Sequence, residues 1–115
     1  GPLLKETSLA EMLSPPDGPA GRLSNGDARG AYYALGWSVK SKDDDKKDFS
    51  HAGSLPGTST VLYCRADGVV WAILFNTRAG RRNQELAPLL ALPLNRIIDQ
   101  IADWPEEDFF ETYLK

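Results

Sequence analysis

The stretch Thr60–Asn76, TVLYCRADGVVWAILFN, decides the fold that we expect for this chain. Two runs rich in β-branched and aromatic residues, at about 60–65 and 69–76, flank Ala66-Asp67-Gly68, and an Asp-Gly pair in this position is a strong hairpin signal. The second run is apolar at both alternating sets of positions, which is typical of a strand that is covered on both faces. We therefore predict a hairpin whose second strand lies in the middle of a sheet, between two layers.

Two further strands are predicted upstream of this hairpin, at about 31–39 and 49–54. The first, AYYALGWSV, is rich in aromatic and β-favouring residues, and Gly36 within it marks a bulge or a close approach. The second is followed by the turn sequence Leu55-Pro56-Gly57. Between the two strands, the mixed-charge run at 40–48 predicts a solvated loop.

The same charge run raises the question of a calcium site. Asp43, Asp44 and Asp45 are consecutive, whereas a calcium-binding loop requires alternating ligands and a glycine at its turn. We therefore expect no calcium site there.

Helices are predicted near both ends of the chain. Ser8-Leu9-Ala10-Glu11 has the spacing of a capping box and predicts a short helix at about 8–13, which Pro15-Pro16 ends. Residues 14–30 are rich in Gly, Pro, Ser, Asn and Asp and predict a long loop. A second helix is expected at about 93–104, with Pro93 in its first turn. The apolar residues whose helical spacing predicts it are Leu90, Leu94, Ile97, Ile98 and Ile101. An amphipathic tail is expected at 106–115.

These elements predict one domain of the α+β class over residues 1–115, a single or partial domain. We expect a mostly antiparallel sheet of three to four strands with a C-terminal helix packed on one face.

Composition narrows the classes of function. The 115 residues carry a formal net charge of −3, and the densest basic run, at 78–82, has no interleaved aromatic residues, so we expect no nucleic-acid partner. No apolar run is long enough to cross a bilayer, and the first residues do not have the pattern of a signal peptide. One histidine and one cysteine are too few for a zinc site, so no metal and no cofactor are predicted.

The only histidine, His51, has two interpretations on the residues alone. It belongs to a catalytic or binding cleft, or it is an ordinary residue near the end of a strand. Ser50 is its neighbour, but successive side chains of a strand point to opposite faces, which disfavours a Ser50–His51 pair in one cleft. The sequence around Ser54 does not match a nucleophile elbow, because position 52 is alanine.

Several short motifs resemble those of one enzyme superfamily. Tyr33-Ala34-Leu35-Gly36-Trp37 is similar to the YGLGW strand of the serine β-lactamases and penicillin-binding proteins. His51-Ala52-Gly53 resembles the third motif of that superfamily, which is Lys-Thr-Gly in many members and His-x-Gly in the esterase-like ones. Ser54–Gly57 resembles the turn that follows, and Trp71–Asn76 resembles the closing strand. The order agrees over residues 8–104, and the class C-like branch of esterases and D-aminopeptidases is the most similar.

Two motifs of the superfamily are missing. Its nucleophile stands in Ser-x-x-Lys, and no serine of this chain has a lysine three residues later. Its second motif, Tyr-x-Asn or Tyr-x-Ser, is also absent. Both precede the third motif in the family. The resemblance therefore implies the C-terminal part of a serine hydrolase that acts on esters, amides or peptides, inactive by itself.

The resemblance also implies roles for four residues. His51 would line the cleft and donate a hydrogen bond, Gly53 would let the backbone and the substrate approach closely, and the main-chain amide of Ser54 would supply one of two oxyanion-hole donors; Ala52 belongs to the same substrate-binding motif. His51 and Ser54 are thus the candidate catalytic residues, and all four are candidate substrate-binding residues.

A second function remains open, in which the chain is a stand-alone binding or accessory domain that kept the scaffold without the catalysis. The expected partners are the N-terminal part of the same protein or a second copy, joined through exposed sheet surface. The resemblance implies a bacterial periplasmic or secreted location.

Overall fold

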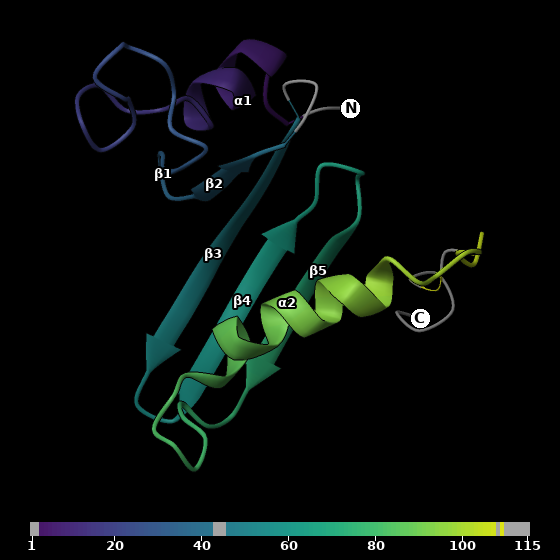
Figure 1. The fold of residues 1–115 in the computed structure, drawn as a ribbon. Coiled ribbons are helices and arrows are strands. Elements are labelled where there is room, and N and C mark those ends of the chain that lie inside the picture. Colours follow the sequence, from purple (N-terminus) through teal and green to yellow (C-terminus); the bar gives the residue numbers. More distant parts are fainter. Residues whose placement is uncertain (1–2, 43–45, 108, 110–115) are drawn as a thin grey trace.

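The computed structural model describes residues 3–42, 46–107 and 109, and it has the α+β architecture that the sequence predicts. Five antiparallel strands form one sheet in the order β1-β2-β3-β4-β5, so each strand pairs with its neighbour in sequence. Figure 1 shows the long strands β3 (Lys47–Leu55), β4 (Thr58–Cys64) and β5 (Val70–Phe75), with α2 (Leu86–Ile98) lying across β4 and β5. The sheet has one strand more than the upper number expected.

Two tight turns join the long strands, and both were predicted. Pro56 and Gly57 connect the paired residues Leu55 and Thr58, and Gly57 has a φ of 85°, as the third position of a type II turn requires. In the next turn, Gly68 has a φ of 92° and donates its amide to the Arg65 carbonyl oxygen at 3.1 Å. Glycine adopts this left-handed conformation without the steric cost that a side chain would add.

The single strand expected at 31–39 is wrong, because the chain reverses within it. β1 (Ala31–Tyr33) pairs antiparallel with β2 (Ser38–Ser41), and a turn lies between them. The Ala34 amide donates to the Trp37 carbonyl oxygen at 2.8 Å, and Gly36 has a φ of 81°. Gly36 therefore serves a turn and not a bulge or a close approach.

The loop expected at 40–48 is shorter than predicted, because both of its ends belong to strands. Lys40 and Ser41 lie in β2 and pair with Asp48 and Lys47 of β3. Asp43, Asp44 and Asp45, for which we expected no calcium site, lie outside the described residues.

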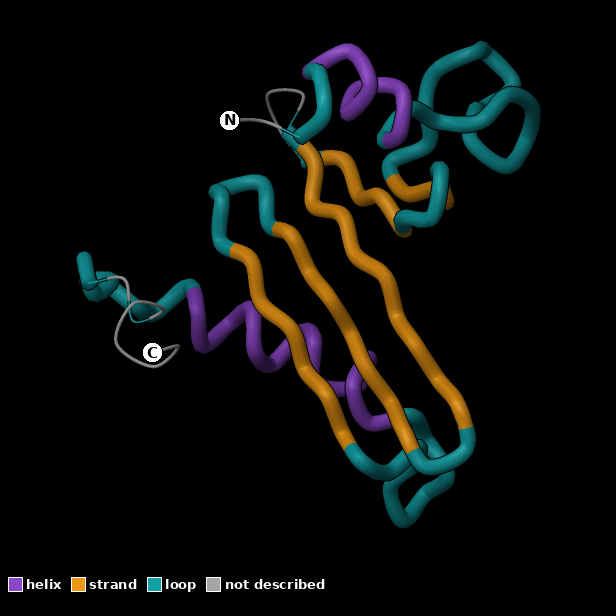
Figure 2. The backbone as a smooth tube through the Cα atoms, turned by 180° about the vertical axis from the view of Figure 1, so that it is seen from behind, coloured by secondary structure: helices purple, strands orange, loops and turns teal. Residues whose placement is uncertain are grey.

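The position expected for the last strand is also wrong. β5 is an edge strand of the described sheet, and α2 lies on only one of its faces. Trp71, Ile73 and Phe75 are half-buried on the side of α2, whereas Val70 is 60% exposed and Leu74 is 77% exposed on the other side. Figure 2 shows this open face of β3, β4 and β5, with α2 behind them.

Helix α2 begins and ends earlier than the predicted 93–104. Pro93 lies inside it and Ile101 lies beyond its end, while Pro88 occupies the first turn. Glu85, at the N-cap position, makes no side-chain capping bond; instead the buried Ser59 Oγ of β4 accepts the Ala87 amide at 3.1 Å. The helix therefore begins where a strand supplies its cap.

Helix α1 spans Glu6–Met12, so the predicted capping box is wrong. Ser8 lies within the helix, and Lys5 occupies the N-cap position without a side-chain capping bond. The long loop at 14–30 is confirmed: it contains one isolated bridge, Arg22 to Ala28, and no helix or strand. Most of the tail predicted at 106–115 lies outside the described residues.

The buried apolar side chains form two small groups. Tyr32 and Val39 lie at the β1–β2 end, where the Tyr32 hydroxyl donates to the Leu13 carbonyl oxygen at 2.8 Å, just after α1. Val61, Ala87 and Ile98 lie between the sheet and α2. The residues from His51 to Leu55 extend past the end of β2 and pair with β4 alone.

Candidate functional site

The third-motif residues lie on a strand edge that is open in the described structure. Pairing between β2 and β3 ends at Ser38 and Ser50, whereas β3 remains paired with β4 as far as Leu55. The Lys42 amide donates to the Lys46 carbonyl oxygen at 2.8 Å, so the main-chain groups of Lys46 point toward the β2 side. Along a strand, the main-chain N–H and C=O groups of successive residues point alternately to its two sides. Those of Ala52 and Ser54 therefore point to the same side as those of Lys46, away from β4 and toward the open edge.

His51 lies at the start of this open edge, immediately after the last residue paired with β2. Its side chain is exposed, and its ring centroid lies 6.5 Å from that of Tyr33, with the ring planes tilted by 55°. His51 and Gly53 also border a shallow hollow of about 340 Å³ on the open face of the sheet. The side chains of Leu62, Ala72 and Leu74 lie on this face and make most of its wall apolar, and Thr60, Val61 and Ile73 also border the hollow.

Gly53 is required by a neighbour within the sheet. A Cβ atom at this position would lie 2.5 Å from the Thr60 Oγ1 atom of β4. This contact is too short for any real side chain, so Thr60 would have to move. The sequence suggested a different reason for this glycine, namely close approach of a substrate.

Ser54 does not form a pair with His51. Side chains alternate along β3, so those of His51 and Ser54 lie on opposite faces of the sheet. The Ser54 Oγ accepts a hydrogen bond from Arg78 Nε at 3.0 Å, and Arg78 also forms an ion pair with Glu85 at 3.6 Å. Arg78 was not among the predicted site residues. The main-chain amide of Ser54, which is the group given a role by the resemblance, lies at the open edge.

Two other potential nucleophiles, Ser59 and Cys64, are also engaged or protonated. The Ser59 Oγ is fully buried and holds the start of α2. Burial raises the pKa of the Cys64 thiol, which keeps it in the protonated, poorly nucleophilic form. No described serine is hydrogen-bonded to His51.

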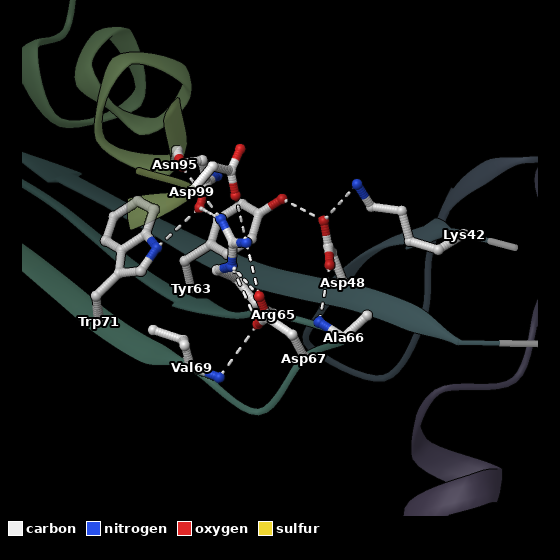
Figure 3. Close-up of polar contacts among 10 residues, drawn as sticks. All are labelled: Lys42, Asp48, Tyr63, Arg65, Ala66, Asp67, Val69, Trp71, Asn95 and Asp99. Atoms are coloured by element: carbon white, nitrogen blue, oxygen red, sulfur yellow. Dashed lines mark hydrogen bonds and ion pairs between the residues drawn. The ribbon is translucent and has the colours of Figure 1, made fainter. Parts of the chain in front are cut away.

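A second polar site lies on the face of the sheet that carries α2, and the sequence did not predict it (Figure 3). Asp48 is only 7% exposed; it accepts hydrogen bonds from Tyr63 Oη at 3.0 Å and from the Ala66 amide at 2.9 Å, and it forms an ion pair with Lys42 Nζ at 3.2 Å. Burial raises the pKa of Asp48, but the hydrogen bonds outweigh burial and hold the pKa below its ordinary value. Burial and the neighbouring Asp48 carboxylate raise the pKa of Tyr63 to about 12.

Arg65 forms the other half of this site. Its Nη2 atom lies 2.7 Å from an oxygen of Asp67 and 2.6 Å from an oxygen of Asp99, and its Nη1 atom donates to the Asn95 side chain at 3.3 Å. The Asn95 Oδ1 also accepts the indole N–H of Trp71 at 3.1 Å, and the Trp71 ring stacks on Tyr63 with a centroid separation of 5.0 Å. These contacts attach α2 to the sheet.

The two groups of residues border one hollow of about 330 Å³, which we call the charged hollow. It lies between β2, the β4–β5 turn and the second half of α2. The sequence placed Asp48 in a solvated charge run, where nothing distinguishes it from its neighbours. Only the pairing of β3 with β2 and β4 shows that this one carboxylate of the run is buried.

Three further observations bear on possible functions. Within the part of the chain that the structure describes, no group of three or more His, Cys, Asp or Glu side chains could hold a metal ion. None of the described helices is both long and apolar enough to span a bilayer. Comparison of the chain with protein families, with curated proteins and with solved structures gives no match.

Proposed function

We propose that this chain is the C-terminal portion of a serine hydrolase related to the β-lactamases and penicillin-binding proteins, and that the whole enzyme acts on esters, amides or peptides. The proposal rests on the motif resemblance. One structural observation supports it: the His-x-Gly motif lies on a strand edge left open where β2 ends, with the Ser54 amide pointing outward. An amide directed into open space can stabilise the oxyanion of an acyl-transfer reaction.

In this proposal the chain supplies half of an active site. The His51 side chain donates to the substrate or to a tyrosine of the upstream part, and the Ser54 amide is one oxyanion-hole donor. The nucleophilic serine and its lysine belong to the upstream part.

The isolated chain is expected to hydrolyse neither a chromogenic cephalosporin nor a short p-nitrophenyl ester above the rate in buffer. The physical reason is the lack of a serine with a lysine three residues later. Intact mass after incubation with a fluorophosphonate probe checks this directly. A covalent adduct on any serine would contradict the proposal.

A second experiment tests His51 in a protein that contains the upstream part. His51→Ala is expected to lower kcat/KM by roughly 10–1000-fold, the scale of losing one positioned donor. His51→Asn, which keeps an N–H donor, should lose less. Arg82→Ala, at an exposed position, is the control and should leave kcat/KM unchanged. Equal kinetics of His51→Ala and the parent protein would show that His51 has only a structural role.

The alternative is a stand-alone, non-catalytic binding domain on the same scaffold, and the charged hollow favours it. The reading frame upstream of this sequence separates the two candidates. Ser-x-x-Lys followed by Tyr-x-Asn or Tyr-x-Ser supports the hydrolase, whereas a start codon just before Leu3 supports the binding domain.

A further inference from the structure

The charged hollow contains more positive than negative charge, although the chain as a whole has a formal net charge of −3. Four cationic and three anionic side chains line it. The cations are Lys40, Lys42, Arg65 and Arg96. Since like charges gathered around one hollow repel each other, an anion bound among them would relieve that repulsion.

The three carboxylates are already committed to two of the cations. Asp48 pairs with Lys42, and Asp67 and Asp99 both pair with Arg65. The side chains of Lys40 and Arg96 form no ion pair or hydrogen bond with the described residues. Two cations therefore remain available to a ligand.

The fold places these two cations on different walls of the hollow. Lys40 stands opposite Asp48 in the β2–β3 register, and paired residues of neighbouring strands point to the same face, so its side chain lies on the α2 face of the sheet. Arg96 lies in α2, next to Asn95, whose side chain contacts Arg65 and Trp71. The polar network of Figure 3 thus holds the helix that carries Arg96 against the strands.

We propose that the charged hollow binds a small oxyanion, a phosphate or carboxylate group, between Lys40 of β2 and Arg96 of α2. The guanidinium of Arg96 can donate two parallel hydrogen bonds to such a group, and the ammonium of Lys40 acts as a point charge. This site is separate from the open edge around His51, whose side chain points to the other face of the sheet. It does not depend on the proposed hydrolase function.

Both cations are exposed, so binding is expected to be weak and sensitive to salt. Equilibrium dialysis with radiolabelled inorganic phosphate at low ionic strength tests the proposal. We expect about one phosphate per chain and a Kd of about 1 mM, which weakens as sodium chloride is added. Competition by succinate, a dicarboxylate, shows whether the site accepts carboxylates as well as phosphate.

The decisive comparison uses two double variants with the same change of net charge. Lys40→Gln with Arg96→Gln should weaken phosphate binding at least tenfold. Arg81→Gln with Arg82→Gln removes two exposed cations outside the hollow and should change the Kd by less than twofold. Circular dichroism confirms that each variant keeps the parent fold. Equal weakening in both variants, or no saturable binding by the parent chain, would overturn the proposal.

Discussion

Asp48 is a buried carboxylate that accepts hydrogen bonds from Tyr63 of β4 and Ala66 of the β4–β5 turn and forms an ion pair with Lys42, the residue that follows β2. Asp48→Asn places an amide donor where the carboxylate only accepted. We expect a loss of about 1.5–3 kcal/mol in the free energy of unfolding at pH 7, measured by urea denaturation. Asp103→Asn, at an exposed position, is the matched control and should change it by less than about 0.5 kcal/mol.

The lowered pKa of Asp48 also predicts a pH dependence. The folded-state pKa lies below the unfolded-state value of about 4, so the carboxylate contributes stability above that value. The contribution is lost as the pH falls through the folded-state pKa. Urea midpoints of the parent chain should therefore decrease below about pH 4, and those of Asp48→Asn should decrease less steeply. Parallel curves would show that Asp48 is not the group responsible.

Gly53 and Thr60 should be coupled. Gly53→Ala is expected to destabilise the fold by about 1–3 kcal/mol, because the new Cβ would meet Thr60 Oγ1 at 2.5 Å. Thr60→Ala removes the obstructing oxygen, so the double variant should be more stable than the sum of the two single effects predicts. Urea denaturation of all four proteins measures the coupling energy. Strict additivity would show that the glycine is needed for another reason.

At the level of elements, α2 depends on a hydroxyl from a strand. Ser59→Ala leaves the Ala87 amide without its acceptor in a buried position, and should cost about 1–2 kcal/mol of unfolding free energy. Loss of helical ellipticity at 222 nm should precede loss of the sheet during thermal unfolding. Ser38→Ala, at an exposed position of β2, should have little effect on either.

The elements that the sequence predicted well are those determined by neighbouring residues. Pro56-Gly57 and Asp67-Gly68 specify their turns locally, so the β3–β4–β5 meander was predicted. The start of α2 was not, because its cap is Ser59, which is 28 residues away in sequence. Gly36 fits a bulge and a turn equally well in sequence, and only the pairing of β1 with β2 decides between them.

The candidate sites divide in the same way. The motif resemblance singled out His51, which lies where β2 ends, and its role in a cleft stays a prediction. The charged hollow was missed because its members come from distant segments and carry no motif. Sequence charge patterning cannot show that Asp48 is buried, nor that Lys40 and Arg96 have no ion-pair partner among the described residues.

For the whole molecule, the outer edge of β5, which no strand of the described sheet covers, and the exposed apolar face of β5 should cause association. A strand edge with free main-chain groups can pair with another chain, and Val70 and Leu74 carry no charge that would oppose it. The isolated chain should form dimers or larger species at micromolar concentration, as measured by light scattering.

A charge on that face is the direct test. Leu74→Lys should shift the chain toward monomer, whereas Leu35→Lys, at an exposed residue of the β1–β2 turn, should not. A monodisperse parent chain with a sharp two-state melt would favour a domain that evolved to stand alone over the C-terminal portion of a hydrolase.

The alternation of main-chain direction along β3 and β5 has a consequence for isotope exchange in heavy water. Amides that point toward β4 are in the ladder and should exchange slowly, whereas those at the two free edges have no partner strand. Along β3 the slow amides are His51, Gly53 and Leu55, with Ala52 and Ser54 fast between them; along β5, Trp71 and Ile73 are slow and Ala72 and Leu74 fast. Residue-resolved exchange rates should therefore alternate with a period of two. If another strand covers one of these edges, the amides that exchange fast along that edge will exchange slowly. The residues whose exchange slows will show whether the covered edge belongs to β3 or to β5.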